Sequence, residues 1–242
     1  MGHTRPDWST YGKLETVFAL FDLGELAARL GSIDTFERGG NVIFLDDFEG
    51  GKGKWESGSF GDGSGTVLTA ETARSGAYAV KLYCGAGIGR YARLTRYLPY
   101  PVIGKMGIEV SFAIPDVPAA FYLTLNLYNG TIVSRAMLQY KPSDESLSYR
   151  DSLGFFHIIA SGLNLLRDLH SFHTLKLVAD YKDVKYTRVI LDQATYNLSS
   201  YALSSTADTT RAQLQAQLHA YSETAGASQV YIDDVIITQN EE

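Results

Sequence analysis

The sequence contains a single cysteine, Cys84, so no disulfide can form within the chain and nothing indicates an oxidising compartment. It also lacks an apolar run long enough to span a bilayer. The first residues, 1–13, are polar and lack the apolar core of a signal peptide. We therefore expect a protein made in the cytoplasm without a signal peptide, which reaches a virion or an extracellular surface by assembly or lysis.

Basic residues are not in excess, since 21 Lys and Arg against 27 Asp and Glu give a net charge of −6. Phosphate binding needs a basic patch and none stands out, so nucleic acid is not expected as a partner. Proline is scarce at six residues, whereas there are 23 Gly, 16 Tyr and 11 Phe. Glycine suits tight turns and aromatic residues suit pleated surfaces, so this composition favours an all-β fold.

The N-terminal segment differs from the rest of the chain. Residues 1–12 are typical of an extended arm, and the stretch that follows has apolar residues at helical spacing, with a capping-box pattern at Asp22 and Glu25. An isolated apolar helix of this size needs a surface on which to bury its stripe. We therefore predict that residues 1–31 are an assembly arm that contacts another copy of the chain, or shell or tail proteins. Its predicted contact residues are Trp8, Leu14, Val17, Phe18, Phe21, Leu26 and Leu30.

From residue 32 the hydrophobic period changes to two, and short apolar-polar segments alternate with Gly, Pro or Asn turns. Many short strands without alternating helices indicate an antiparallel two-sheet sandwich over residues 32–242, carried behind the N-terminal helical arm. One segment is ambiguous, because residues 209–222 fit a helix by propensity and a strand of the sheet equally well.

Four segments carry a family resemblance. DDFEGGKGKWESG, at residues 46–58, joins an acidic-aromatic-acidic strand motif to a glycine-rich loop with a tryptophan. ARSGAYAVKL at 73–82 is a small-residue turn and a strand, YIDDVIIT at 231–238 is a closing strand, and residues 172–198 are a His-led hairpin. In this order they resemble jelly-roll carbohydrate-binding modules and the wider concanavalin-like group of lectins, glucanases and laminin-G-like domains. Phage surface proteins often use such sandwiches, which is an analogy at the level of fold.

The resemblance implies a jelly-roll sandwich and a structural calcium ion. In several such modules the first and last strands lie side by side, and acidic residues of both hold the metal. Calcium prefers several carboxylate and carbonyl oxygens, so the residue types are suitable. Alternatively, these are strand-end acids that face solvent or pair with Lys or Arg. The implied ligands are Asp47, Glu49, Asp233 and Asp234.

Catalytic motifs are not found. Glucanases of this fold use paired carboxylates in a Glu-x-Asp-x-x-Glu pattern, which is absent here. His170 and His173 form an H-x-x-H spacing without a third ligand, and a strand would point them to opposite faces. Cys84 has no positioned His and is typical of a small buried residue. We predict that the protein is not an enzyme.

Two functions remain open. The first is a structural component of a virion surface, such as a decoration, fibre or tail-type protein, and the apolar arm favours it. The second is a carbohydrate-binding module that recognises a glycan through surface aromatic residues, with Trp55 as one candidate. Tyr122, Asn126 and Tyr128 lie at even spacing, so an unbulged strand would present them on one face. That face could equally be the solvent side of an ordinary strand, and we favour the assembly role.

Overall fold

In the computed structural model, the described residues are 39–115 and 119–242. The predicted arm and its contact residues lie outside these ranges, as do the first residues of the predicted sandwich, 32–38. The domain boundary at residue 31 therefore stays a prediction. Within the described ranges, no helix is long and apolar enough to cross a membrane.

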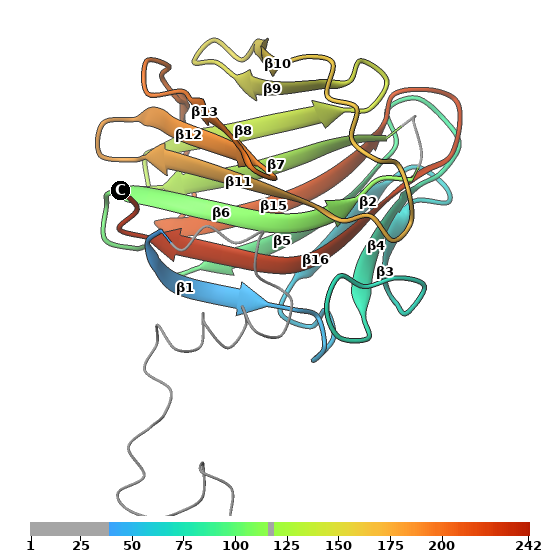
Figure 1. Ribbon diagram of the computed structural model, residues 1–242. Coiled ribbons are helices and arrows are strands. Elements are labelled where there is room, and N and C mark those ends of the chain that lie inside the picture. Colours follow the sequence, from blue (N-terminus) through green and yellow to red (C-terminus); the bar gives the residue numbers. More distant parts are fainter. Residues whose placement is uncertain (1–38, 116–118) are drawn as a thin grey trace, which may run out of the picture. The chain divides into compact units, whose positions relative to one another are not determined.

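The described residues form sixteen strands in two antiparallel sheets (Figure 1). Sheet A contains β1 (Asn41–Asp46), β3 (Gly65–Thr69), β4 (Ala79–Cys84), β6 (Lys105–Ala113), β11 (His173–Asp180), β12 (Lys185–Leu191), β13 (Ala194–Asn197) and β16 (Ser228–Gln239). Sheet B contains β2 (Glu56–Phe60), β5 (Tyr91–Leu98), β7 (Ala119–Tyr128), β8 (Ile132–Lys141), β9 (Ser146–Arg150), β10 (Phe156–Ala160), β14 (Ser204–Ala207) and β15 (Gln213–Ser222).

The last two strands of the chain, β15 and β16, each lie in the interior of one sheet. Sheet A runs β13-β12-β11-β6-β16-β4-β3, with β1 beside β16, and sheet B runs β10-β9-β8-β7-β15-β5-β2, with β14 beside β8. Thus β15 and β16 occupy central positions, although they come from the C-terminal part of the chain. The first described strand, β1, pairs with β16 from Asn41–Gln239 to Asp46–Val235, as the family resemblance implies.

The ambiguous segment is a strand. In β15, Leu214 and Leu218 are buried in the core, whereas Gln217 and His219 point to the opposite side. Full pairing with β5 and β7 satisfies the backbone groups of this strand on both sides. The tertiary context therefore overrides a sequence whose local propensity also suits a helix.

The two sheets are joined by apolar contacts and by tyrosine hydroxyls. Phe112 of sheet A stacks on Phe121 of sheet B with ring centroids 5.0 Å apart. At the end of β11, the Tyr181 hydroxyl donates to a main-chain oxygen of β7 at 2.5 Å. The Tyr186 hydroxyl of β12 donates to a main-chain oxygen of β9 at 2.7 Å and accepts from the Met137 amide of β8 at 3.0 Å. These bonds fix the position of one sheet relative to the other.

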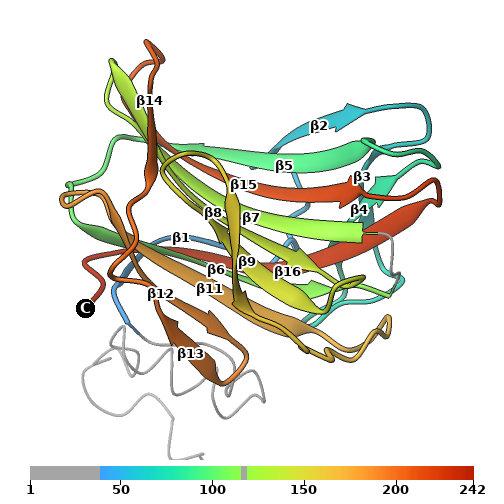
Figure 2. The same ribbon diagram turned by 90° about the horizontal axis from the view of Figure 1, so that it is seen from above.

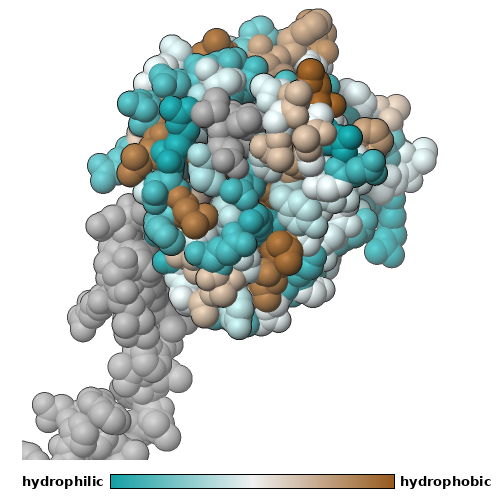
Figure 3. Space-filling view, turned by 90° about the vertical axis from the view of Figure 1, so that its right-hand side faces the viewer, coloured by the Kyte–Doolittle hydropathy of each residue, from teal (hydrophilic) through white to brown (hydrophobic). Residues whose placement is uncertain are grey.

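Seen from above, the strands of sheet B curve along their length (Figure 2). On the side of the molecule shown in Figure 3, hydrophobic residues occur in small separate patches among hydrophilic ones. That side therefore lacks the broad apolar surface that is typical of a large protein interface.

Candidate functional site

The outer face of sheet B, which points away from the core, gathers aromatic and uncharged polar side chains. Along β7, Phe121, Leu123 and Leu125 point into the core, so the alternating residues point outward. The same alternation in the paired strands places one set of side chains on this face. They include Gly58, Phe60, Tyr91, Arg93, Thr95, Tyr97, Tyr122, Thr124, Asn126, Tyr128, Arg135, Gln139, Phe156, Gln215, Gln217, His219 and Tyr221.

An aromatic row crosses this face from β2 to β10. Phe60 stacks on Tyr91 with centroids 5.9 Å apart, and Tyr91 meets the His219 ring edge-on at 4.8 Å. His219 lies 5.4 Å from Tyr122, whose ring is 6.0 Å from Phe156. The row takes one ring from each of five strands, and its consecutive centroid distances limit its length to at most about 22 Å. A surface of this length suits an extended chain better than one small molecule.

Sheet B bends toward its outer face at the β10 end of the row. Tyr122 and Phe156 are separated by three strand steps, or about 14 Å along a flat sheet. Their rings nevertheless come within 6.0 Å of one another. The bend also explains why polar residues in the centre of this face are shielded, since Thr124 is only 2% exposed and Asn126 only 3%.

A cluster of amide groups lies beside the aromatic row. The Asn126 side-chain amide donates to Gln215 Oε1 at 2.8 Å, and the Tyr128 hydroxyl donates to the same oxygen at 3.3 Å. In the row itself, the Gln139 amide donates to the Tyr122 hydroxyl at 2.6 Å. Asn126 Oδ1 is buried and has no hydrogen-bond partner within the described structure. A buried acceptor without a partner is costly, so this atom would gain from a ligand hydroxyl once the side chains that cover it move aside.

His219 is the central residue of the row and is electrically neutral at pH 7. Burial, and secondarily the positive charge of Arg93, lower its pKa to about 4. Its Nε2 atom is buried and, among the described residues, finds no hydrogen-bond partner. A neutral imidazole both donates and accepts, so His219 can recognise a hydroxyl in either role.

The structure brings together three of the four residues predicted to bind a glycan and separates the fourth. Tyr122, Asn126 and Tyr128 all lie on the outer face of sheet B. Trp55 does not, because its ring is 6% exposed and packs in the core against Phe44. This corrects the expectation for Trp55.

The Trp55 indole is held from within the fold by an acidic side chain. Its Nε1 donates to Asp46 Oδ2 at 2.8 Å, and the other oxygen of that carboxylate accepts from Lys54 at 2.7 Å. The glycine-rich loop therefore presents its tryptophan to the core and not to a ligand.

The acidic residues assigned to calcium bind a turn of the chain instead. Asp233 Oδ2 accepts from the amides of Arg74 and Ser75 at 2.8 and 3.1 Å, and Asp234 accepts from the Arg74 guanidinium at 3.1 Å. Glu49 Oε1 accepts from the amides of residues 77 and 78 at 2.7 and 2.8 Å. The amide and guanidinium groups that face these carboxylates repel a cation.

Asp47 does not join this arrangement, because within the described residues its Oδ1 atom accepts from the main-chain amide of Glu49 alone, at 3.2 Å. No group of three or more His, Cys, Asp and Glu that could hold a metal occurs in the described part of the chain. The residues present therefore do not fit the calcium site that the resemblance implied. Burial and the neighbouring Asp234 raise the pKa of Asp233 to about 7.

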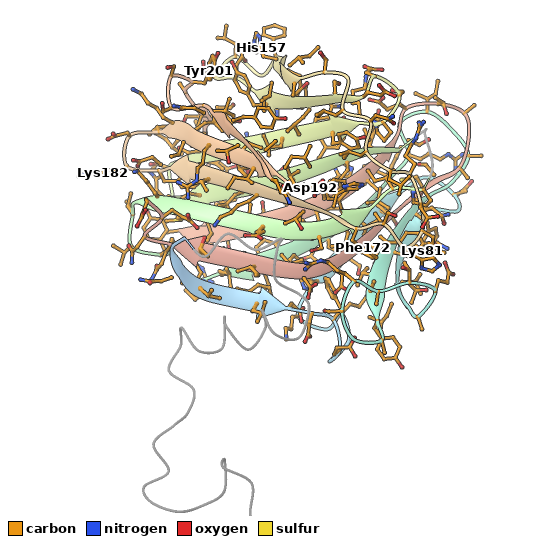
Figure 4. The ribbon with its side chains drawn as sticks, in the orientation of Figure 1. Lys81, His157, Phe172, Lys182, Asp192 and Tyr201 are labelled. Atoms are coloured by element: carbon orange, nitrogen blue, oxygen red, sulfur yellow. The ribbon has the colours of Figure 1, made fainter. Side chains whose placement is uncertain are left out.

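The H-x-x-H histidines are also structural. His173 bonds Asp192 Oδ2 at 2.8 Å through Nδ1, and Figure 4 shows Asp192 at the end of β12. Burial opposes the charge on His173, but the Asp192 carboxylate outweighs it and raises the pKa of the imidazole. His170 contacts the Thr72 hydroxyl at 3.3 Å. Each histidine thus has a separate partner.

A cavity of about 540 Å³ lies on the outer side of sheet A, next to β3 and β4. Lys81, which is labelled in Figure 4, forms an ion pair with Glu71 at 2.9 Å. The Tyr231 hydroxyl donates to Glu71 at 2.6 Å, and these two hydrogen bonds lower the pKa of the carboxyl. The charged groups of this cavity satisfy one another, which distinguishes it from the outer face of sheet B.

A buried ionic cluster occupies another part of the outer side of sheet A. Lys176 Nζ contacts Glu241 Oε1 at 3.0 Å, and Arg188 contacts Glu241 Oε2 at 3.0 Å. The Thr238 hydroxyl donates to Glu241 at 2.5 Å. Lys176 is only 1% exposed, so its charge depends on these carboxylate contacts.

Comparison with known proteins identifies the fold. No family model and no curated protein matches the sequence. Among solved structures, a sialidase has a TM-score of 0.53 at 12% identity over 86% of this chain, which spans 19% of the sialidase. A carbohydrate esterase of the Shiga toxin-encoding bacteriophage phi24B has a TM-score of 0.53 at 14% identity, covering 84% of this chain and 100% of that one. The potassium-bound carbohydrate recognition domain of Emp46p has a TM-score of 0.50 at 13% identity, covering 82% and 94%.

These neighbours correct one prediction and confirm another. The expectation that the protein is not an enzyme is wrong as an exclusion, because the fold is shared with a sialidase and a carbohydrate esterase. The absence of one glucanase motif tested only one way of placing catalytic groups on this fold. The predicted fold is confirmed: the chain is a concanavalin-like, galectin-like jelly-roll sandwich.

Proposed function

We propose that residues 39–242 form a carbohydrate-binding domain that holds a glycan chain along the outer face of sheet B. The aromatic row is the observation that carries this proposal, since Phe60, Tyr91, His219, Tyr122 and Phe156 make a continuous ring surface across the sheet. Sugar rings present apolar faces edged with hydroxyl groups, so they match aromatic rings flanked by polar side chains.

Unpaired polar atoms beside the row support the same proposal. Asn126 Oδ1 and His219 Nε2 are buried and lack partners in the described structure. In a site built to bind hydroxyls, such atoms gain their hydrogen bonds from the ligand. The Emp46p carbohydrate recognition domain and a phage carbohydrate esterase share the fold, which adds support by analogy.

Glycan-array screening followed by titration calorimetry tests the proposal. We expect Tyr122→Ala to lower the affinity for the best-bound glycan about tenfold or more, because stacking and the hydrogen bond from Gln139 are both lost. Tyr83→Ala is the matched control, since Tyr83 is a 37% exposed tyrosine on the outer side of sheet A. Equal losses in both variants, or no bound glycan on the array, would contradict the proposal.

The assembly role predicted for residues 1–31 is a second proposal, and it fits a virion surface protein. A bacteriophage protein among the structural neighbours supports it by analogy alone. Light scattering on the full chain and on residues 32–242 tests it. We expect the full chain to be oligomeric and the shortened chain to be a folded monomer, and two monomers of equal stability would refute the role of the arm.

A further inference from the structure

The strands in the centre of sheet B carry charge of one sign. β5, β7, β8 and β15 contain no Asp or Glu. They do contain four basic residues, although the chain as a whole has a net charge of −6. The central strands of the proposed glycan site therefore differ in sign from the rest of the molecule. These basic residues are Arg93, Arg96, Arg135 and Lys141.

Three of the four have a hydrogen-bond or ion-pair partner within the fold, although Arg96 Nε is itself unpaired in the described structure. Arg96 donates to a main-chain oxygen at 2.7 Å and lies over an aromatic ring at 4.7 Å. Arg135 donates to the Thr206 hydroxyl at 3.0 Å. Lys141 forms an ion pair with Asp144 at 2.9 Å. Their charges are committed to contacts within the protein.

Arg93 is different, because the described structure gives its guanidinium no hydrogen-bond acceptor and no ion pair. Its Nε atom is buried and unpaired. The guanidinium lies against Gly58 of β2, where a Cβ atom would come within 3.3 Å of Nη2. On the same face, Glu56 of β2 makes no ion pair with it. Because β15 pairs Arg93 with His219, this cation lies next to the aromatic row.

An exposed ring surface borders this cation. Phe60 follows Gly58 by two residues on the outer face of β2 and is 62% exposed. It stacks on Tyr91, with 22° between the ring planes. A sugar ring can therefore lie on Phe60 while its acidic substituent reaches Arg93.

We propose that the glycan bound by this domain is anionic, and that its carboxylate or sulfate group binds Arg93. This inference rests on the proposed function and adds the charge of the ligand to it. The planar guanidinium matches two oxygens of a carboxylate or sulfate, and such charge-assisted bonds are roughly twice as strong as neutral ones. The lack of acidic residues in the central strands removes the repulsion that an anionic ligand would otherwise meet.

Calorimetry with the full chain tests the inference on three probes: uronate oligosaccharides, their neutral methyl esters, and sulfated galactan oligosaccharides. The wild type should bind at least one acidic set about tenfold more tightly than the neutral esters, and the stronger set identifies carboxylate or sulfate as the group recognised. Arg93→Gln should abolish this preference, with a smaller loss of affinity for the neutral esters than for the acidic probes. Lys182→Gln is the control, since it removes one exposed positive charge between β11 and β12 of sheet A, and it should retain the preference.

Gly58→Ala provides a second test that keeps every charge. The added methyl group would meet Nη2 at 3.3 Å, so the guanidinium must shift by a few tenths of an ångström, and the preference for acidic probes should fall less than in Arg93→Gln. Thermal melting of each variant verifies its folding. Equal binding of acidic and neutral probes by the wild type would overturn the charge inference alone, whereas binding of none of them would overturn the glycan proposal with it.

Discussion

The outer sides of the two sheets differ in their charged groups, although the described part of sheet A also carries buried hydroxyls without partners, Ser111 Oγ and Thr174 Oγ1. On the outer side of sheet A, charged residues satisfy one another, as Glu241 does with Lys176 and Arg188. On the outer face of sheet B, Arg93 Nε, Asn126 Oδ1 and His219 Nε2 have no partners within the described structure. Paired buried charges hold a fold together, whereas unpaired polar atoms beside exposed rings favour a ligand. We therefore assign a structural role to the first surface and a binding role to the second.

Removing a charge from sheet A should have the largest effect on stability and none on binding. Glu241→Ala removes the carboxylate that contacts both Lys176 and Arg188 at 3.0 Å, so we expect the free energy of unfolding to fall by about 3 kcal/mol. Urea denaturation measures this loss. Glu242→Ala is the control, since only the main-chain oxygen of Glu242 bonds Arg188. Loss of glycan affinity in Glu241→Ala at a temperature where it stays folded would break the distinction between the sheets.

Lowering the pH should reduce the free energy of unfolding through His219 of sheet B. The His219 pKa is about 4 in the folded state and near 6.5 in the unfolded state, so the unfolded state takes up the proton first as the pH falls. The resulting loss of unfolding free energy between pH 6.5 and pH 4 is on the order of 2 kcal/mol. His219→Gln should lose less stability than the wild type over this window. Parallel pH profiles for the two proteins would show that His219 is not held neutral.

At Asp233, lowering the pH should instead increase the free energy of unfolding. Its folded pKa of about 7 lies above the 3.8 that is usual for an aspartate, so the folded state takes up the proton first. Its contribution to stability is greatest below pH 3.8 and is lost as the pH rises through 7. Asp233→Asn should therefore flatten the decline in unfolding free energy between pH 4 and pH 8. A steeper decline in this variant would mean that the Arg74 and Ser75 amides keep the carboxyl ionised.

The smallest expected effect concerns the bonds between the sheets. Tyr186→Phe removes one hydroxyl that serves both β8 and β9, and we expect a loss of about 1–2 kcal/mol in unfolding free energy. Chemical denaturation measures it, with Tyr196→Phe as the control because no hydrogen bond of its hydroxyl joins the sheets. Glycan affinity should not change, and a change would indicate that the relative position of the sheets shapes the site.

The fold was predictable from local patterns. The even spacing of Tyr122, Asn126 and Tyr128 predicts that they share one face of a strand, and the structure places all three on the outer face of β7. Residues 213–222 carry the same alternation, with Leu214, Ala216, Leu218 and Ala220 buried, and that period could have decided between strand and helix.

The candidate site was predictable only in part, because it depends on pairing between distant segments. Phe60, His219 and Phe156 come from β2, β15 and β10. The local sequence of these strands does not predict that they belong to the same sheet. Trp55 misled the sequence interpretation, since a tryptophan in a glycine-rich loop suggests exposure. In the folded chain the Trp55 indole is buried, and it donates a hydrogen bond to Asp46, nine residues earlier in the sequence.

The central position of β15 and β16 has a consequence for synthesis of the chain. In the folded protein, β15 lies between β7 and β5, and β16 lies between β6 and β4. Until residues 213–239 leave the ribosome, both of these positions are empty. Four strands then present unpaired backbone edges to their surroundings, the condition in which nascent β proteins associate wrongly. The sandwich should therefore form late and all at once, with chaperone protection most valuable just before the last two strands emerge.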